Sequence, residues 1–256
     1  MVSWIIKILF SKIKFHYSNI FFVFVFFLTG LFKEFIIIFS LILIHEFGHL
    51  VGAFLCGWKI DKIDIYPYGG CVKFDDDINK SLYQEIIILL FGPFFQFIYY
   101  LIIFICFSNN LMLDRTFDIF NNYHYTLLFF NFLPIYPLDG GKLMNILNNY
   151  FFPYKKGNIL TIILSLIFLV ICFIFYRSFN FYLMGFMLII DIIIYLKRQD
   201  YLYNKFLLER YLNKYKFRKR KVIRNKNNMY KERYHVICYD DKYITEKQYL
   251  NKRFGG

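Results

Sequence analysis

The chain has 256 residues, of which 58% are hydrophobic and 23% aromatic, with 31 Lys and Arg against 18 Asp and Glu. Its apolar residues come in blocks long enough to cross a bilayer, for which about 20 residues suffice. This clustering excludes an ordinary soluble domain and predicts an all-α polytopic membrane protein. The five cysteines form no CxxC pair, so the sequence indicates neither a disulfide framework nor a thiolate zinc site.

The N-terminal residues 1–17 lack a cleavage site for a signal peptide and are predicted to form an amphipathic helix on the cytoplasmic face of the membrane. A membrane domain over residues 18–196 follows, and a basic cytoplasmic tail occupies residues 197–256. The domain contains six apolar spans, at 18–32, 35–57, 83–107, 124–147, 158–176 and 180–196.

The charges between the spans predict how the chain is oriented. With the N-terminus inside, the inside segments 1–17, 58–82 and 148–157 carry three, four and two Lys or Arg, whereas each outside connection carries one. Cytoplasmic loops of membrane proteins carry an excess of Lys and Arg. The sequence therefore predicts a multi-pass protein of the cell membrane with both termini in the cytoplasm.

The second span contains the pattern His45-Glu46-Phe47-Gly48-His49. Residues four positions apart lie on one face of a helix, so the two His can bind one Zn²⁺ and Glu46 is placed as a general base. Such a short pattern also occurs by chance in unrelated proteins. Here it lies in an apolar span, where a charged residue costs about 2.5–3.5 kcal/mol on insertion scales, and this cost favours a functional site.

Two His leave a catalytic zinc one protein ligand short. The candidate third ligand is Asp139, the only carboxylate in the segment NFLPIYPLDGGK of the fourth span. Pro134, Pro137 and the pair Gly140-Gly141 should break the helix around it and free backbone groups that need a polar cavity. The alternative is that Asp139 caps a helix that resumes after a proline kink. The sequence predicts one zinc ion per chain.

The connection 58–82 is predicted to form a short β-hairpin or re-entrant strand at the membrane edge. Apolar residues alternate at Ile63 and Ile65, and a Pro-Tyr-Gly-Gly turn follows before Cys71-Val72-Lys73-Phe74. Alternation bounded by turn residues is typical of paired strands.

HEFGH in one span, with NFLPIYPLDGG in a later one, resembles the site-2 protease family of intramembrane metalloproteases. The resemblance covers residues 35–150 by motifs and the rest by layout. The six spans and the cytoplasmic tail without an inserted domain are most similar to its sporulation branch, the stage IV sporulation protein FB group. The family implies two zinc-binding His, a zinc-binding Asp and a catalytic Glu, which correspond to His45, His49, Asp139 and Glu46.

The same resemblance implies residues that hold substrate. The Asn that opens the second motif, here Asn131, would hold the substrate or the oxyanion, and Pro137 is a further candidate. An edge strand over residues 68–74, with Gly69 and Gly70, would pair with an unwound substrate by β-addition, although a plain connecting loop fits these residues equally well. The family often has Asn after a Gly-Pro in the third span. Gln96 departs from that pattern and receives no role.

The tail carries 18 Lys or Arg against 6 Asp or Glu. This surplus favours contact with anionic lipid, and no recognisable fold supports nucleic-acid binding. The tail is predicted to be helical to about Arg220, and its end, HVICYDDKYITEKQYL, to form a strand, an Asp-Asp turn, a strand and the start of a helix. At most it is a reduced half of the nucleotide-binding CBS domain that the resembled sporulation proteases carry.

The sequence therefore predicts a zinc-dependent intramembrane endopeptidase. The sporulation resemblance implies a membrane-associated pro-protein as substrate, such as an inactive sigma-factor precursor, and a membrane partner protein that holds the enzyme in check. Two alternatives are a metal transporter that uses the same His and Asp, and a catalytically inactive membrane scaffold. A metal transporter would not need a Glu beside the first His. An inactive scaffold would not need the complete set of two His, one Glu and one Asp.

Overall fold

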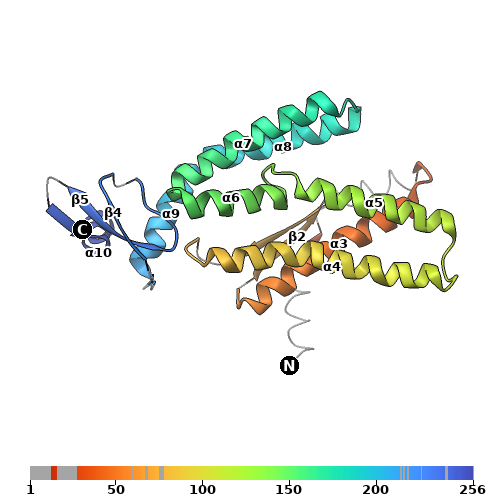
Figure 1. The fold of residues 1–256 in the computed structure, drawn as a ribbon, viewed down its shortest axis with the longest axis horizontal. Coiled ribbons are helices and arrows are strands. Elements are labelled where there is room, and N and C mark those ends of the chain that lie inside the picture. Colours follow the sequence, from red (N-terminus) through yellow and green to blue (C-terminus); the bar gives the residue numbers. More distant parts are fainter. Residues whose placement is uncertain are drawn as a thin grey trace. The chain divides into compact units, whose positions relative to one another are not determined.

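The structure is a computed structural model of the chain (Figure 1). It describes residues 13–15, 28–58, 60–66, 69–74, 78–213, 215, 217, 219–225, 227–239 and 242–255. The chain divides into two compact units, which are residues 1–76 with 87–130 and residues 77–86 with 131–256.

The first unit packs three helices, which are the apolar helix α3 (Phe32–Leu55), most of the apolar helix α4 (Leu82–Ser108) and most of α5 (Asp114–Phe132). Their shared core contains Ile37 and Leu41 of α3 and Phe120 of α5, with Tyr99 and Tyr100 of α4 packed against it. Many other large side chains of α4, such as Phe94, Phe97 and Ile102, remain exposed. An apolar helix with an apolar exposed surface suits a lipid environment rather than water.

A small sheet completes the first unit, with the strand order β1-β2-β3. Strand β2 (Ile60–Tyr66) pairs antiparallel with β3 (Gly69–Phe74) and parallel with β1 (Ile13–Phe15). The predicted hairpin is confirmed. Strand β3 begins at Gly69 and Gly70 and lies at an edge of the sheet, against α3. The turn residues Pro67 and Tyr68 lie outside the described residues.

The prediction of a helix over residues 1–17 is wrong at residues 13–15, which form strand β1. An amphipathic pattern in so short a segment fits either structure, and backbone partners on β2 decide in favour of the strand, since backbone donors and acceptors must be paired. The rest of that segment lies outside the described residues.

The second unit contains three helices that precede the tail, α6 (Asp139–Phe151), α7 (Tyr154–Phe175) and α8 (Phe179–Lys197). Polar side chains join them: Asn145 Nδ2 donates to Asn158 Oδ1 and Thr161 Oγ1 at 3.1 Å each, and lies 3.3 Å from the Tyr195 hydroxyl. Amide and hydroxyl groups that bond one another across helices stabilise helix packing in an apolar medium.

Three of the described helices, α3, α4 and α7, are long and apolar enough to cross a membrane. They correspond to the predicted spans 35–57, 83–107 and 158–176. The predicted span 124–147 is not one helix, because α5 ends at Phe132 and α6 begins at Asp139. The break was expected from the prolines and glycines of this segment. A layout of six spans stays a prediction, since residues 18–27 of the first one lie outside the described part of the chain.

The tail consists of α9 (Gln199–Leu212), β4 (Lys219–Ile223), β5 (Arg233–Tyr239), β6 (Lys242–Thr245) and α10 (Glu246–Phe254). Strand β5 pairs parallel with β4 and antiparallel with β6. The predicted strand, strand and helix at the end of the chain are therefore confirmed, and the Asp240-Asp241 turn is not described. A capping box of Thr245 and Gln248 starts α10. Whether the tail derives from half of a CBS domain stays a prediction.

The prediction of a helix to about Arg220 is wrong, because α9 ends at Leu212 and residues 219–223 form β4. Closely spaced Lys and Arg between residues 214 and 221 repel one another at helical spacing, which disfavours a helix there. In β4, Ile223 is instead buried while Lys219 and Arg220 remain exposed.

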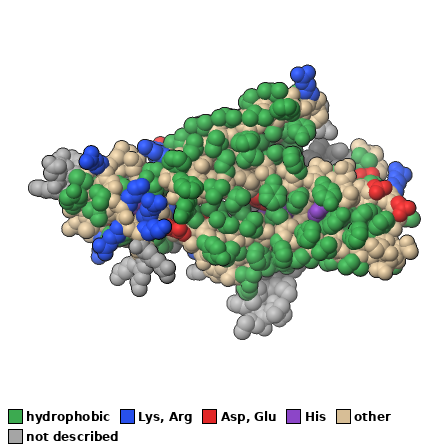
Figure 2. All heavy atoms as spheres, viewed as in Figure 1, with side chains coloured by type: hydrophobic (Ala, Val, Ile, Leu, Met, Phe, Trp, Pro, Cys, Tyr) green, Lys and Arg blue, Asp and Glu red, His purple; other side chains and the backbone are tan. Residues whose placement is uncertain are grey.

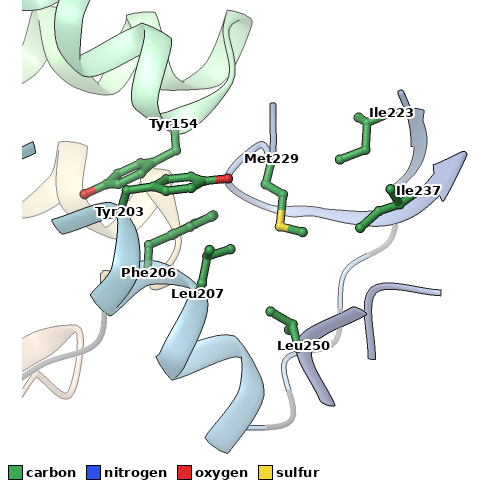
Figure 3. Packing of buried hydrophobic residues seen from close by; sticks show 8 residues of the cluster. All are labelled: Tyr154, Tyr203, Phe206, Leu207, Ile223, Met229, Ile237 and Leu250. Carbon is green, nitrogen blue, oxygen red and sulfur yellow. The ribbon is translucent and has the colours of Figure 1, made fainter. Parts of the chain in front are cut away.

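The tail and the start of α7 share an apolar core, which Figure 3 shows. Phe206 of α9 stacks on Tyr154, the first residue of α7, with ring centroids 4.6 Å apart, and the Tyr154 N–H donates to the carbonyl of Met229 at 2.8 Å. The tail therefore folds against the start of α7. The fully or largely buried members of this core are Tyr154, Tyr203, Phe206, Leu207, Ile223, Met229, Ile237 and Leu250.

Buried charged groups lie beside this core. Arg210 Nη1 donates to Glu246 Oε1 at 2.8 Å, the other carboxylate oxygen lies 2.9 Å from His235 Nδ1, and Arg210 Nε donates to Asn79 Oδ1 at 2.6 Å. Burial lowers the pKa of His235, although Glu246 opposes this. Burial alone would raise the pKa of Glu246, but the hydrogen bond from His235 and the charge of Arg210 lower it.

The turn before β5 also holds the first turn of α4. The Glu232 carboxylate accepts hydrogen bonds from the Ser81 hydroxyl and the Leu82 N–H, both at 2.8 Å, and Lys231 pairs with Glu85. Glu232 itself has a positive φ of 55°. A carboxylate at a helix N-terminus satisfies free N–H groups and suits the helix dipole, so this turn acts as a cap for α4.

We expect the tail to lose stability on acidification. The pKa values of His235 and Glu246 are both lowered in the folded state. Each group therefore stabilises the fold above its unfolded-state pKa, which is about 6.5 for His, and this stabilisation is lost as the pH falls. Hydrogen exchange of β5 and α10, corrected for intrinsic rates, should accelerate from pH 7.5 to pH 5.5. His235→Gln should weaken this pH dependence; unchanged protection across the range would contradict the assignment.

Candidate metal centre

The HEFGH pattern lies in α3, where His45 and His49 are separated by one helical turn. Both side chains are buried, at 2% and 6% exposure, and their Nε2 atoms face each other at 3.2 Å. Glu46 is half-buried on the same turn. The helix thus places two imidazoles and a carboxylate within one turn, as the sequence predicted.

The Nδ1 atoms of both imidazoles are paired with groups of α4. His49 Nδ1 lies 2.9 Å from the carbonyl oxygen of Ile88, which can only accept a hydrogen bond, so Nδ1 is the protonated nitrogen. His45 Nδ1 lies 2.9 Å from Gln96 Oε1. The Gln96 amide donates to the carbonyl of His124 at 3.1 Å, which orients its oxygen toward His45. These acceptors therefore assign to both imidazoles the tautomer protonated at Nδ1.

The position of the ring protons bears on whether these residues can bind a metal. In imidazoles protonated at Nδ1, each Nε2 has a lone pair available for a metal, and the two Nε2 atoms lie 3.2 Å apart. A single cation can accept both lone pairs. Metal-binding His residues usually donate their other ring N–H to an oxygen acceptor, and both imidazoles do so here. The pair therefore fits Zn²⁺ ligation through Nε2.

Glycines allow α4 to approach the imidazoles. A Cβ added at Gly92 would overlap the His49 ring and lie 3.0 Å from His45 Nε2. A Cβ at Gly48 of α3 would overlap the carbonyl oxygen of Phe91, and one at Gly52 would lie 3.1 Å from the Cα of Ile88. Small residues four positions apart are a common way for apolar helices to pack closely.

Asp139 is the first residue of α6, and the preceding loop folds back over the start of that helix. Cβ atoms at Gly140 and Gly141 would overlap backbone atoms of residues 132–136. The Tyr136 N–H donates to Ser165 Oγ of α7 at 3.0 Å, and the Tyr136-Pro137 peptide bond is cis. The Asp139 carboxylate has 14% exposure and forms an ion pair of 3.0 Å with Lys142.

The predicted metal ligands form a group in the structure. Within the described residues, one ligand atom from each of His45, His49 and Asp139 lies within 4.8 Å of the other two. Two imidazole nitrogens and a carboxylate oxygen are a three-ligand set found in catalytic zinc sites, where the fourth position remains for water or substrate. These three residues are thus a candidate His-His-Asp metal centre.

The remaining predicted site residues lie at element ends or in the sheet. Asn131 is half-buried in the last turn of α5, and Pro137 lies in the loop before α6. Gly69 and Gly70 begin the edge strand β3. Their roles stay predictions.

The groups of α4 that hold the two His were not predicted from the sequence. Gln96 received no role, yet it is fully buried and contacts His45. The spacing of Ile88, Gly92 and Gln96, four residues apart, is the only sequence signal for them. A backbone carbonyl such as that of Ile88 carries no side-chain signature at all.

Comparisons with known proteins show which family the chain belongs to. Residues 33–121 match the model of peptidase family M50. The chain is 30% identical over 196 residues to the stage IV sporulation protein FB of Bacillus subtilis, covering 73% of this chain and 67% of the relative. The chain belongs to peptidase family M50. As a member of this family of site-2 proteases it is a metalloendopeptidase.

Two further relatives of the M50 chain come from Methanocaldococcus jannaschii. The zinc metalloprotease MJ0392 is 32% identical over 134 residues, which cover 48% of this chain and only 36% of that protein. A solved structure of a site-2 protease matches with a TM-score of 0.55 and 21% identity, over 70% of this chain and 88% of that one. The latter similarity supports a shared fold.

Gly92→Ala should weaken zinc binding about tenfold or more, because its methyl group would displace the paired imidazoles and their outer contacts. The measurement is chelator competition on the purified chain in detergent. Leu90→Ala is the control, since Leu90 is exposed on the same helix. Wild-type zinc affinity in Gly92→Ala would show that the contact between α4 and the imidazoles is not needed.

Proposed function

We propose that the chain is a zinc-dependent endopeptidase that cleaves a membrane-associated protein within the membrane, with one zinc ion held by His45, His49 and Asp139. The observation that carries the proposal is the buried imidazole pair in an apolar helix, with both Nδ1 protons fixed outward and both Nε2 atoms facing one point. Ionisable residues in an apolar span are costly and are usually functional.

Zinc, when bound, supplies a Lewis acid that polarises a peptide carbonyl and activates water at neutral pH. Glu46 follows His45 directly in α3, and we assign it the role of the base that accepts a proton from the attacking water. Glu46 then delivers this proton to the leaving amine. Asn131 is the candidate that holds the substrate or the developing oxyanion, as the family resemblance implies.

The edge strand β3 supports a route for binding substrate. A transmembrane helix must unwind before a peptide bond can be attacked, and its freed N–H and C=O groups then need partners. The sheet order leaves one side of β3, including Gly69 and Gly70, without a neighbouring strand among the described residues. An extended substrate segment pairs there by β-addition.

The similarity to a stage IV sporulation protein supports a sporulation role. We assign an inactive, membrane-associated sigma-factor precursor as the substrate class, and a membrane protein partner as the inhibitor. The placement of both termini in the cytoplasm, across six spans, rests on the distribution of Lys and Arg.

The tail is assigned to the cytoplasmic membrane surface. Figure 2 shows Lys and Arg side chains gathered over the tail elements, whereas hydrophobic side chains cover much of the apolar helices on the visible face. Exposed cations on the tail attract anionic lipid headgroups. They include Lys219, Arg220, Lys247 and Lys252.

Glu46→Gln should abolish cleavage and leave zinc bound. The amide cannot accept the proton, so the rate should fall by about 10²–10⁴-fold, while the three proposed ligands are unchanged. The measurement is cleavage of a co-expressed candidate substrate, such as a pro-sigma factor, together with the zinc content of the purified chain. Unchanged cleavage would refute the mechanism, and zinc flux that survives the substitution would favour a transporter.

Asp139→Ala provides the complementary change. It should weaken zinc affinity by more than the roughly 10–100-fold that loss of an outer partner costs. Asp191→Ala, which removes an exposed carboxylate from α8, is the control. Full zinc occupancy and affinity in Asp139→Ala would remove Asp139 from the centre.

A photo-cross-linking probe in β3 should test the substrate route. In the Glu46→Gln background, a probe at Val72 should capture alternate residues of a trapped substrate, because successive strand residues point to opposite faces. A probe at Val222 in β4 serves as the control. Equal cross-linking from both probes, or none from β3, would contradict β-addition.

A further inference from the structure

Gln96 is a buried polar side chain in the apolar helix α4, and its three contacts join His45 of α3 to His124 of α5. Its exposure is 0%. Its Oε1 lies 2.9 Å from His45 Nδ1, and its Nε2 donates to the His124 carbonyl at 3.1 Å and lies 3.4 Å from His124 Nδ1. A buried carboxamide costs free energy unless it is hydrogen-bonded, and here both ends are used.

His124, whose carbonyl accepts the hydrogen bond from Gln96, is itself held in place by its packing. His124 of α5 is 2% exposed and its ring stacks on Tyr100 of α4, with centroids 4.5 Å apart. Its carbonyl decides which end of the Gln96 amide faces His45. The chain His124–Gln96–His45 therefore sets both the rotation and the tautomer of the His45 ring.

The contacts from α4 repeat at helical spacing. Ile88, Gly92 and Gln96 are each four residues apart and lie on one face of α4. The Ile88 carbonyl holds His49, Gly92 underlies both rings, and Gln96 holds His45. The four-residue separation on this face of α4 equals the separation of His45 and His49 on α3.

We propose that Gln96 is a positioning residue for metal binding, which acts through His45, and that the Ile88–Gly92–Gln96 face of α4 orients both imidazoles before a metal enters. The inference deepens the proposed function and rests on it. Gln96 holds the Nδ1 proton of His45 in place, so that Nε2 presents its lone pair to Zn²⁺ without rearrangement. Outer partners of this kind fix the orientation and raise the basicity of metal-binding His residues.

The test compares zinc affinities of three variants of the full chain in detergent, measured by chelator competition. Gln96→Met keeps the length of the side chain but removes its acceptor, so zinc affinity should fall about 10–100-fold. Gln96→Glu keeps an oxygen acceptor for His45 and should bind zinc at least tenfold more tightly than Gln96→Met. Gln199→Met is the matched control, because Gln199 is also buried and bonds a backbone carbonyl, that of Tyr195.

A spectroscopic signal separates positioning from general destabilisation. With Co²⁺ in place of zinc, the visible absorption of Gln96→Met should differ from that of the wild type at full occupancy, while Gln199→Met should leave it unchanged. Wild-type affinity and spectrum in Gln96→Met, or an equal loss in Gln199→Met, would overturn the inference.

The outcomes also separate this inference from the proposed function. A wild-type chain that binds no zinc would refute the proposed function itself. A wild-type chain that binds zinc, with a Gln96→Met variant that binds it equally well, would refute only the role of Gln96. Should Gln96→Met fail to fold, Gln96→Glu decides: affinity close to the wild type supports the role, and a hundredfold loss overturns it.

Discussion

The fold around the metal centre depends on one constraint, which is that buried ring nitrogens in an apolar helix need partners. His45 and His49 meet it with two acceptors from α4, the Gln96 amide and the Ile88 carbonyl. With both Nδ1 atoms donating to these groups, the two Nε2 atoms face each other at 3.2 Å. The hydrogen bonds from the second helix therefore orient both imidazoles so that one cation can bind both Nε2 atoms.

Close helix packing makes these hydrogen bonds reachable. Gly48 and Gly52 bring the α3 backbone against Phe91 and Ile88, and Gly92 leaves room for the rings. In an apolar medium, helices gain little from burying further apolar surface, so close contact and interhelical hydrogen bonds provide the association. The glycines therefore serve both the packing and the site. Glu232 also caps the first turn of α4 and so fixes where this helix begins. The same helix carries the two acceptors, the Gln96 amide and the Ile88 carbonyl.

Local chemistry explains which parts of the fold could be predicted. The hairpin of β2 and β3 and the break between α5 and α6 follow from Pro and Gly, which act on their own neighbours. The prediction of a helix up to Arg220 was wrong because strand β4 is stabilised by pairing with β5, ten or more residues away. Strand β1 was missed for the same reason, since its partner β2 lies about 50 residues further along the chain.

The sequence by itself determined the class of protein and the candidate chemistry. Apolar blocks indicated membrane helices, and the spacing of His45, Glu46 and His49 specified two imidazoles and a base on one face, because helical periodicity is a local property. Only the tertiary structure decided the tautomer of the imidazoles and the partners that impose it. Gln96 and the Ile88 carbonyl lie on another helix, about 40–50 residues away, and their contacts depend on how closely two helix backbones approach.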